Sequence, residues 1–164
     1  METTQNKEHN MIKIRKSPSA DTRSADHVIT RDELLLSTEM HISDVRKALK
    51  FLSRKLYSAA LLHDHTKLSR FVEFYEQFHE AQTTGHWGVG WFDQIHIVEE
   101  RHHLKDNCPE DVNLIDVLEM LCDCVMAGLA RTGHYREEEP DAEILVKAYK
   151  NTVKMLIENT EVKQ

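Results

Sequence analysis

The chain contains little glycine and little proline: five and three residues, respectively, among 164. These two residue types favour the turns that strands require in large numbers. No segment alternates apolar and polar residues as a half-buried strand does. We therefore predict an all-α fold, with a single helical domain of about five or six helices.

Long apolar runs and an abundance of cysteine are also absent. No run approaches the roughly 20 apolar residues of a membrane-spanning helix, and the N-terminus lacks the apolar core of a secretory signal. Three cysteines without an export signal argue against a disulfide framework. We expect no membrane association and a cytoplasmic location, in the host cytoplasm if a phage encodes the protein.

The chain also has no excess of basic residues, since its formal net charge is -7. Broad binding to nucleic acid requires a basic surface, so the charge argues against it. It does not exclude a small phosphorylated substrate, because metals held by acidic residues supply positive charge to a phosphate.

The chain is predicted to begin with a flexible N-terminal arm over residues 1–27, which are polar and carry no helical period. The helical domain then covers residues 28–160. Thr30 and Glu33 fit a capping box at the start of its first helix. An apolar stripe follows through Leu52, with a helix break expected near Ser53. The apolar face of the last helix would suit a homodimer.

Histidines and acids fall on or beside these apolar helices. They are the ligand types that borderline divalent metals choose. The candidates are His41, His63, Asp64, His96, His102, His103 and Asp123.

Spacing supports part of this set. His96 and His103 are seven residues apart and point the same way if one helix carries both. Asp123 lies within an apolar helix, where an aspartate is rare unless it is paired or binds metal. Glu119 and Asp116 share its helical face.

The order of these residues resembles the HD-domain superfamily of metal-dependent phosphohydrolases: a histidine, an adjacent His-Asp pair and a distant aspartate, all on helices. The further histidines resemble its two-metal branch, and "HDHTK" resembles the HD-x-x-K of that branch, with Lys67 as its lysine. More narrowly, "HIVEERHH" and "LIDVLEMLCD" are similar to an uncharacterised HD-like family of bacteria and phages. The resemblance covers about residues 38–131.

The resemblance implies two metals. The first would be held by His41, His63, Asp64 and Asp123, and the second by His96, His102 and His103. Asp64 would bridge them, and a bridging hydroxide would attack phosphorus. Lys67 would contact the substrate phosphate, and Glu119 and Asp116 would orient the ligand histidines.

The function expected from the resemblance is hydrolysis of a nucleotide or a related small phosphate ester. Manganese or iron suits the ligands best, and zinc, magnesium, nickel and cobalt stay open. The Gly-Tyr-Pro that marks cyclic-dinucleotide phosphodiesterases is absent after His103, where "LKDNCPED" follows. Two alternatives remain: a di-iron oxygenase on the same scaffold, and a non-catalytic binding or regulatory protein.

Overall fold

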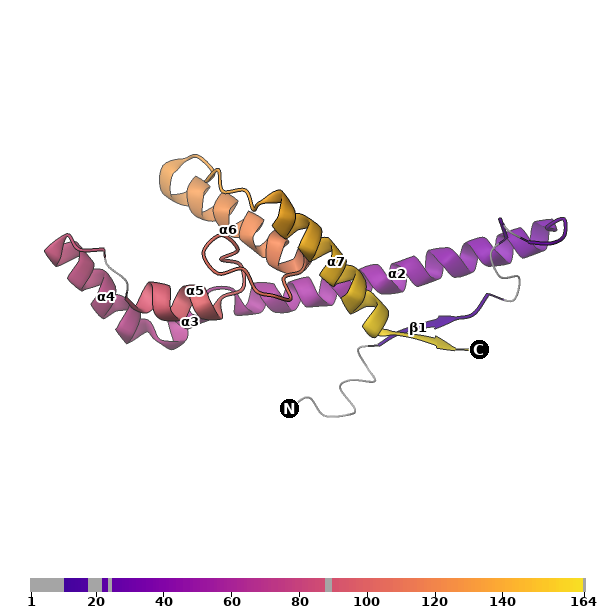
Figure 1. Ribbon diagram of the computed structural model, residues 1–164, viewed down its shortest axis with the longest axis horizontal. Helices are drawn as coiled ribbons and strands as arrows, with labels where there is room; N and C mark the ends of the chain where they lie inside the picture. Colours follow the sequence, from indigo (N-terminus) through magenta and orange to yellow (C-terminus); the bar gives the residue numbers. More distant parts are fainter. Residues whose placement is uncertain (1–10, 18–21, 24, 88–89, 164) are drawn as a thin grey trace. The chain divides into compact units, whose positions relative to one another are not determined.

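The computed structural model describes residues 11–17, 22–23, 25–87 and 90–163 (Figure 1). The all-α prediction is confirmed. The helices are α2 (Arg31–Leu62), α3 (His65–Ser69), α4 (Phe71–Thr84), the π-helical turn η1 (Phe92–His96), α5 (Ile97–Glu99), α6 (Leu114–Thr132) and α7 (Ala142–Glu158). Where the sequence predicts a single domain over residues 28–160, the chain forms two compact units: residues 1–55 with 153–164, and residues 56–152.

The first unit contains a small sheet that the sequence analysis did not predict. Strand β1 (Ile12–Arg15) pairs in parallel with β2 (Thr160–Lys163), and Ile12 lies opposite Thr160 (Figure 1). Ile12 is buried. The predicted flexible arm is therefore wrong over residues 12–15, because this strand is stabilised by a partner from the far end of the chain. Residues 1–10, 18–21 and 24 of that arm lie outside the described residues.

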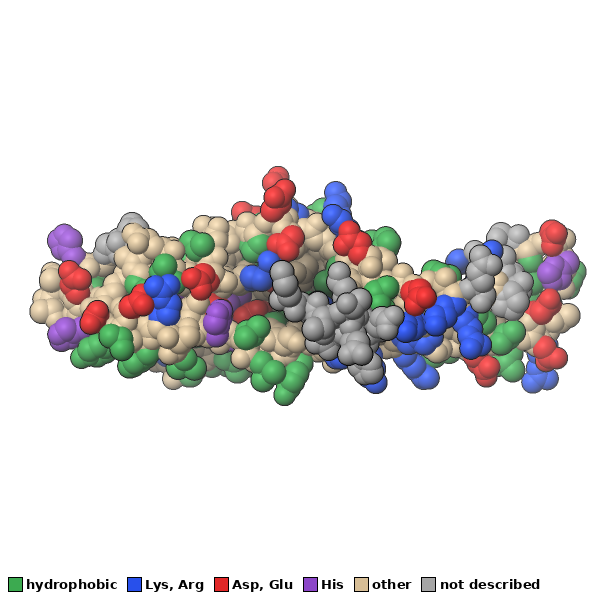
Figure 2. All heavy atoms as spheres, turned by 90° about the horizontal axis from the view of Figure 1, so that it is seen from below, with side chains coloured by type: hydrophobic (Ala, Val, Ile, Leu, Met, Phe, Trp, Pro, Cys, Tyr) green, Lys and Arg blue, Asp and Glu red, His purple; other side chains and the backbone are tan. Residues whose placement is uncertain are grey.

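Helix α2 begins as the sequence predicts. The Thr30 hydroxyl accepts from the backbone N–H of Glu33, and the Glu33 carboxylate accepts from the backbone N–H of Thr30, at 3.3 and 2.8 Å. The predicted break near Ser53 is absent, and the helix runs unbroken to Leu62. Its predicted core stripe is largely exposed, since Phe51 is the one buried residue of the helix. Figure 2 likewise shows hydrophobic side chains on the surface that it presents.

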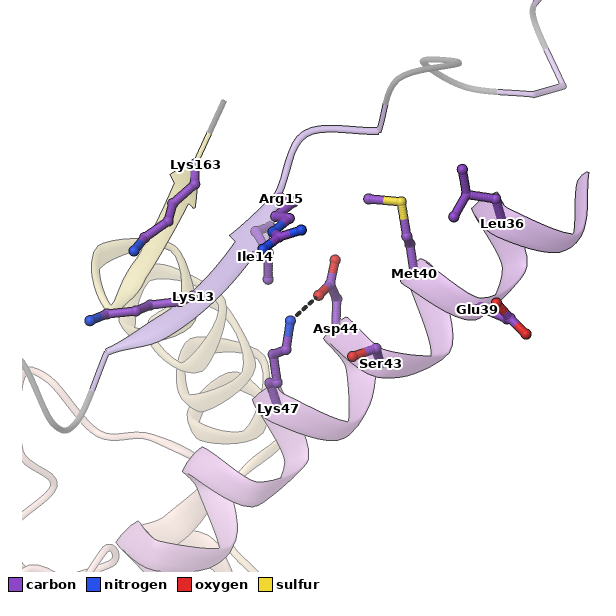
Figure 3. A pocket seen from close by; sticks show the side chains of 10 residues that line it. All are labelled: Lys13, Ile14, Arg15, Leu36, Glu39, Met40, Ser43, Asp44, Lys47 and Lys163. Atoms are coloured by element: carbon purple, nitrogen blue, oxygen red, sulfur yellow. Dashed lines mark hydrogen bonds and ion pairs between the residues drawn. The ribbon is translucent and has the colours of Figure 1, made fainter. Parts of the chain in front are cut away.

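A groove of about 440 Å³ in the first unit lies between β1 and the first half of α2. Figure 3 shows Ile14 of β1 and Met40 of α2 on its walls, together with several basic side chains. Lys47 donates to Asp44 across 2.7 Å. Glu39 and Asp44 provide the acidic side chains of this groove, and histidine is absent from its lining.

The core of the second unit packs α6 against the loop before it and against α7. It contains Leu104, Val112, Met120, Cys124 and Ala148. Helix α6 ends with Gly133 at φ 75°, a left-handed cap of the kind that glycine favours, and its N–H bonds to the Leu129 carbonyl.

The acidic residues of α6 share its inner side. The Asp116, Glu119 and Asp123 side chains are 5%, 13% and 24% exposed. The helix thus places a row of carboxylates beside the core, where the second unit gathers its histidines. No helix in the described part of the chain is long and apolar enough to cross a membrane.

Candidate metal centre

The turn between α2 and α3 brings His63 and Asp64 together. Neighbours on a helix diverge by about 100°, but α2 ends at Leu62 and Asp64 has left-handed backbone geometry, with φ 56°. This conformation is uncommon outside glycine, and aspartate tolerates it better than most residues. His63 Nε2 lies 3.8 Å from Asp64 Oδ2 and 3.6 Å from Asp123 Oδ1. The three residues form one group of converging ligand atoms.

A second group consists of His96, His102 and His103. His96 ends the π-helical turn η1, a type of turn that is frequent at functional sites. The predicted helix does not persist to His103, because α5 ends at Glu99 and Glu100 is extended. The following turn still brings His103 Nε2 to 2.9 Å from His96 Nε2.

Asp64 lies between the two groups. Its Oδ2 faces His63, and its Oδ1 lies 3.4 Å from His96 Nε2 and 3.7 Å from His102 Nε2. Oδ1 is buried and has no hydrogen-bond partner. Atoms that bind one metal at about 2.0–2.2 Å each lie about 3–4 Å apart. These distances and the unpartnered oxygen therefore fit a carboxylate that two metals share.

Glu119 contacts the opposite side of two histidines. Its Oε1 lies 3.0 Å from His63 Nδ1 and 3.2 Å from His102 Nδ1. Burial would raise the pKa of Glu119, but these two histidines lower it overall. Burial would likewise lower the pKa of His102, and Glu119 raises it. A carboxylate at Nδ1 leaves each Nε2 directed at Asp64, which is the arrangement typical of metal-binding histidines.

Lys67 is the cation closest to this centre. Its ammonium donates to Asp64 Oδ2 at 2.6 Å and lies 5.9 Å from the centre of the Phe92 ring. Burial would raise the pKa of Asp64, and the Lys67 charge lowers it overall. Burial, together with the charges of Lys67 and His103, lowers the pKa of His96 to about 4. At neutral pH His96 is therefore neutral, as a metal ligand must be.

The ligand groups found among the described residues do not include His41. His41 lies exposed on α2 in the first unit, whereas His63, Asp64 and Asp123 belong to the second. Within α2, almost six helical turns separate His41 from Leu62.

Asp116 also differs from its predicted role of orienting histidines. Its two oxygens accept from Arg101 Nε and Nη2, each at 2.8 Å, and Oδ2 also accepts from the backbone N–H of Asn113 at 2.9 Å. Asp116 thus belongs to the α6 capping box and to an ion pair with Arg101.

Thr66 and Glu100 are the residues that sequence reasoning missed. Both are buried beside His96, and the Thr66 hydroxyl lies 2.7 Å from His96 Nδ1. Their only sequence signal is that Thr66 lies within "HDHTK" and Glu100 within "EERHH". Nothing in that signal distinguishes Glu100 from Glu99, whose side chain is 48% exposed.

Comparison with known proteins gives no match. No family model matches the chain, and no match to a curated protein or to a solved structure was found. The function is therefore inferred from the residues of the centre itself.

Proposed function

We propose that the chain is a metal-dependent phosphohydrolase with two metal positions that share Asp64. One observation carries the proposal: the Asp64 carboxylate lies between two groups of ligand atoms, with the buried Oδ1 unpartnered. Two-metal sites hold their ions about 3.5–4 Å apart, and a carboxylate that presents one oxygen to each group fits such a pair.

The two positions differ in exposure, which supports an enzyme that a substrate reaches from one side. The His63, Asp64 and Asp123 side chains are 31%, 27% and 24% exposed, whereas His96 and His102 are 0% and 2% exposed. A phosphate ester would approach the first position, whereas the second would be held by the buried His96 and His102 together with the partly exposed His103.

The residues of the chain have separate tasks in this proposal. Bound metals lower the pKa of water enough to supply a nucleophile near neutral pH, and they stabilise charge on phosphoryl oxygens. Asp64 holds both positions at a fixed separation, and Glu119 keeps His63 and His102 directed at them. Lys67, 26% exposed beside Asp64, donates to a phosphate oxygen of the substrate.

The substrate class follows from the resemblance and the charge. A nucleotide or a related small phosphate ester fits a centre whose metals meet the phosphate on a chain of net charge -7. Manganese or iron fits a mixture of imidazole and carboxylate ligands.

The first test is elemental analysis of the purified protein beside the His63→Ala and Asp64→Ala variants. His79→Ala is the matched control, because His79 is exposed on α4 and belongs to none of the three ligand groups found among the described residues. We expect about two metals per chain in the parent and the control, and a loss of metal in both centre variants.

Activity is then measured on p-nitrophenyl phosphate, bis-p-nitrophenyl phosphate and a panel of nucleotides, with manganese present. Hydrolysis that the Asp64→Ala variant loses supports the proposal. Iron as the bound metal, with oxygen consumption and no hydrolysis, would replace it with the oxygenase alternative. A parent that takes up no metal even after reconstitution with manganese would leave a non-catalytic binding protein instead.

A further inference from the structure

A buried threonine and a buried glutamate lie behind His96, on the side away from Asp64. Thr66, His96 and Glu100 are 1%, 0% and 4% exposed. The Thr66 hydroxyl is 2.7 Å from His96 Nδ1 and 2.7 Å from Glu100 Oε1. Since α3 carries Thr66 and the chain after α5 carries Glu100, the network links two segments of the second unit.

The direction of each hydrogen bond follows from counting protons. Thr66 donates its single hydroxyl proton to Glu100 Oε1. The bond between Thr66 and His96 then needs its proton from the imidazole. His96 Nδ1 therefore donates to Thr66 Oγ1 across the 2.7 Å contact.

Glu100 is fixed independently of this hydroxyl. Its Oε1 also accepts from the backbone N–H of Thr66 at 2.9 Å, and His65 Nδ1 lies 3.0 Å from the same oxygen. The acceptor is thus anchored to the backbone of α3, which leaves the hydroxyl of Thr66 one orientation.

We propose that Thr66 and Glu100 are positioning residues that fix His96 as its Nδ1–H tautomer and thereby form the second metal position. A neutral imidazole with its proton on Nδ1 has its lone pair on Nε2. Nε2 is the atom that faces Asp64 Oδ1 at 3.4 Å and His103 Nε2 at 2.9 Å. The network thus directs a lone pair towards the ligand group before any metal binds.

The role is distinct from that of Glu119, which contacts His63 and His102 but not His96. His63 and His102 would then share Glu119 at their Nδ1 atoms, and His96 would have Thr66. Removal of such outer partners typically costs 10–100-fold in metal affinity. The inference rests on the proposed function only where it assigns a metal to this position, because the tautomer itself is a property of the metal-free protein.

The direct experiment measures the His96 tautomer in the metal-free protein by long-range proton–nitrogen NMR. We expect a protonated Nδ1 and an unprotonated Nε2 in the parent at neutral pH. A parent with the proton on Nε2 overturns the proposal without any variant.

Two substitutions test whether Glu100 is the reason that His96 carries its proton on Nδ1. Glu100→Met removes the acceptor and frees the Thr66 hydroxyl to donate to His96 Nδ1, so the proton should move to Nε2. Glu99→Met, at the exposed neighbouring position, should change nothing. If Glu100→Met keeps the parent tautomer, the proposal is wrong.

Thr66→Val and Thr66→Ser separate positioning from packing. The valine removes the hydroxyl and should lower metal affinity at the second position by about 10–100-fold. The serine keeps the hydroxyl and should bind metal as the parent does. Thr152→Val is the matched control. Thr152 is also a buried threonine, and its hydroxyl bonds to Leu114 N and Ala148 O, away from the centre. It should lose stability and keep metal affinity.

The experiments distinguish a failure of the proposed function from a failure of the positioning role of Thr66. If metal binding depends on Thr66 but no phosphate ester is hydrolysed, the proposed function fails and the positioning role stands. If the parent hydrolyses a phosphate ester and Thr66→Val binds metal as tightly as the parent, the positioning role fails alone.

Discussion

The ion pair between Arg101 and Asp116 gives the most direct test of what stabilises the second unit. Asp116→Asn keeps the shape of the side chain and removes its charge. In the parent the carboxylate accepts two bonds from the Arg101 guanidinium at 2.8 Å each, and two from the backbone N–H and side-chain amide of Asn113 at 2.9 Å each. The Asp116 side chain is 5% exposed, and it raises the pKa of the Arg101 guanidinium.

The magnitude follows from which bonds survive. An asparagine with its oxygen in the place of Asp116 Oδ2 still accepts from Asn113 and from Arg101 Nη2, but without the charge. Its amide NH2 then faces Arg101 Nε, and both of these groups only donate. Hydrogen bonds to charged groups contribute about 1.5–3 kcal/mol each. Since the Arg101 side chain is 41% exposed, water replaces part of the loss. We expect Asp116→Asn to lower the free energy of unfolding by about 2–3 kcal/mol.

The assay is urea unfolding of the metal-free protein, supported by thermal melts that should shift down by about 4–12 °C. Asp111→Asn is the matched control. Asp111 contacts the same guanidinium at 3.0 Å, but its side chain is 80% exposed, so its loss should cost at most about 1 kcal/mol. Equal effects of the two substitutions, or an Asp116→Asn variant as stable as the parent, would refute the reasoning.

Three further predictions concern the centre. Glu119→Gln should weaken manganese binding by about 10–100-fold in a chelator competition, because it weakens the Nδ1 contacts of His63 and His102; parent-like affinity would contradict its orienting role. His41→Ala should bind manganese as the parent does, and a loss of affinity would place His41 in the centre after all. The pKa of His96 is about 4 in the folded chain and 6.5 in the unfolded chain. Between pH 6.5 and pH 4 the unfolded chain therefore binds a proton at this residue that the folded chain does not bind. Urea unfolding should therefore show the metal-free protein losing about 3 kcal/mol as pH falls from 6.5 to 4. His96→Gln should lack this share of the pH dependence, and an identical pH slope in the two proteins would refute the assignment.

The sequence predicted those features of the fold that depend on residues close together in the chain. The capping box of Thr30 and Glu33 and the left-handed Gly133 cap each depend on residues within a few positions, and both are present. The continuity of α2 was not readable, because small residues near Ser53 permit either a break or a helix. Strand β1 was missed because its partner, β2, lies at the far end of the chain.

For the candidate centre, the sequence by itself predicted most of the residues that form the ligand groups: His63, Asp64, Asp123 and the histidines after α4. It did so because imidazole and carboxylate are the ligand types that divalent metals choose. Only the tertiary structure decided which of them converge. The left-handed turn at Asp64 directs that carboxylate to both groups, and Arg101 rather than a histidine pairs with Asp116. The ligand groups among the described residues leave out His41, which belongs to the other unit. The physical reason is that convergence depends on backbone direction between elements, and a periodic pattern within one element carries no information about it.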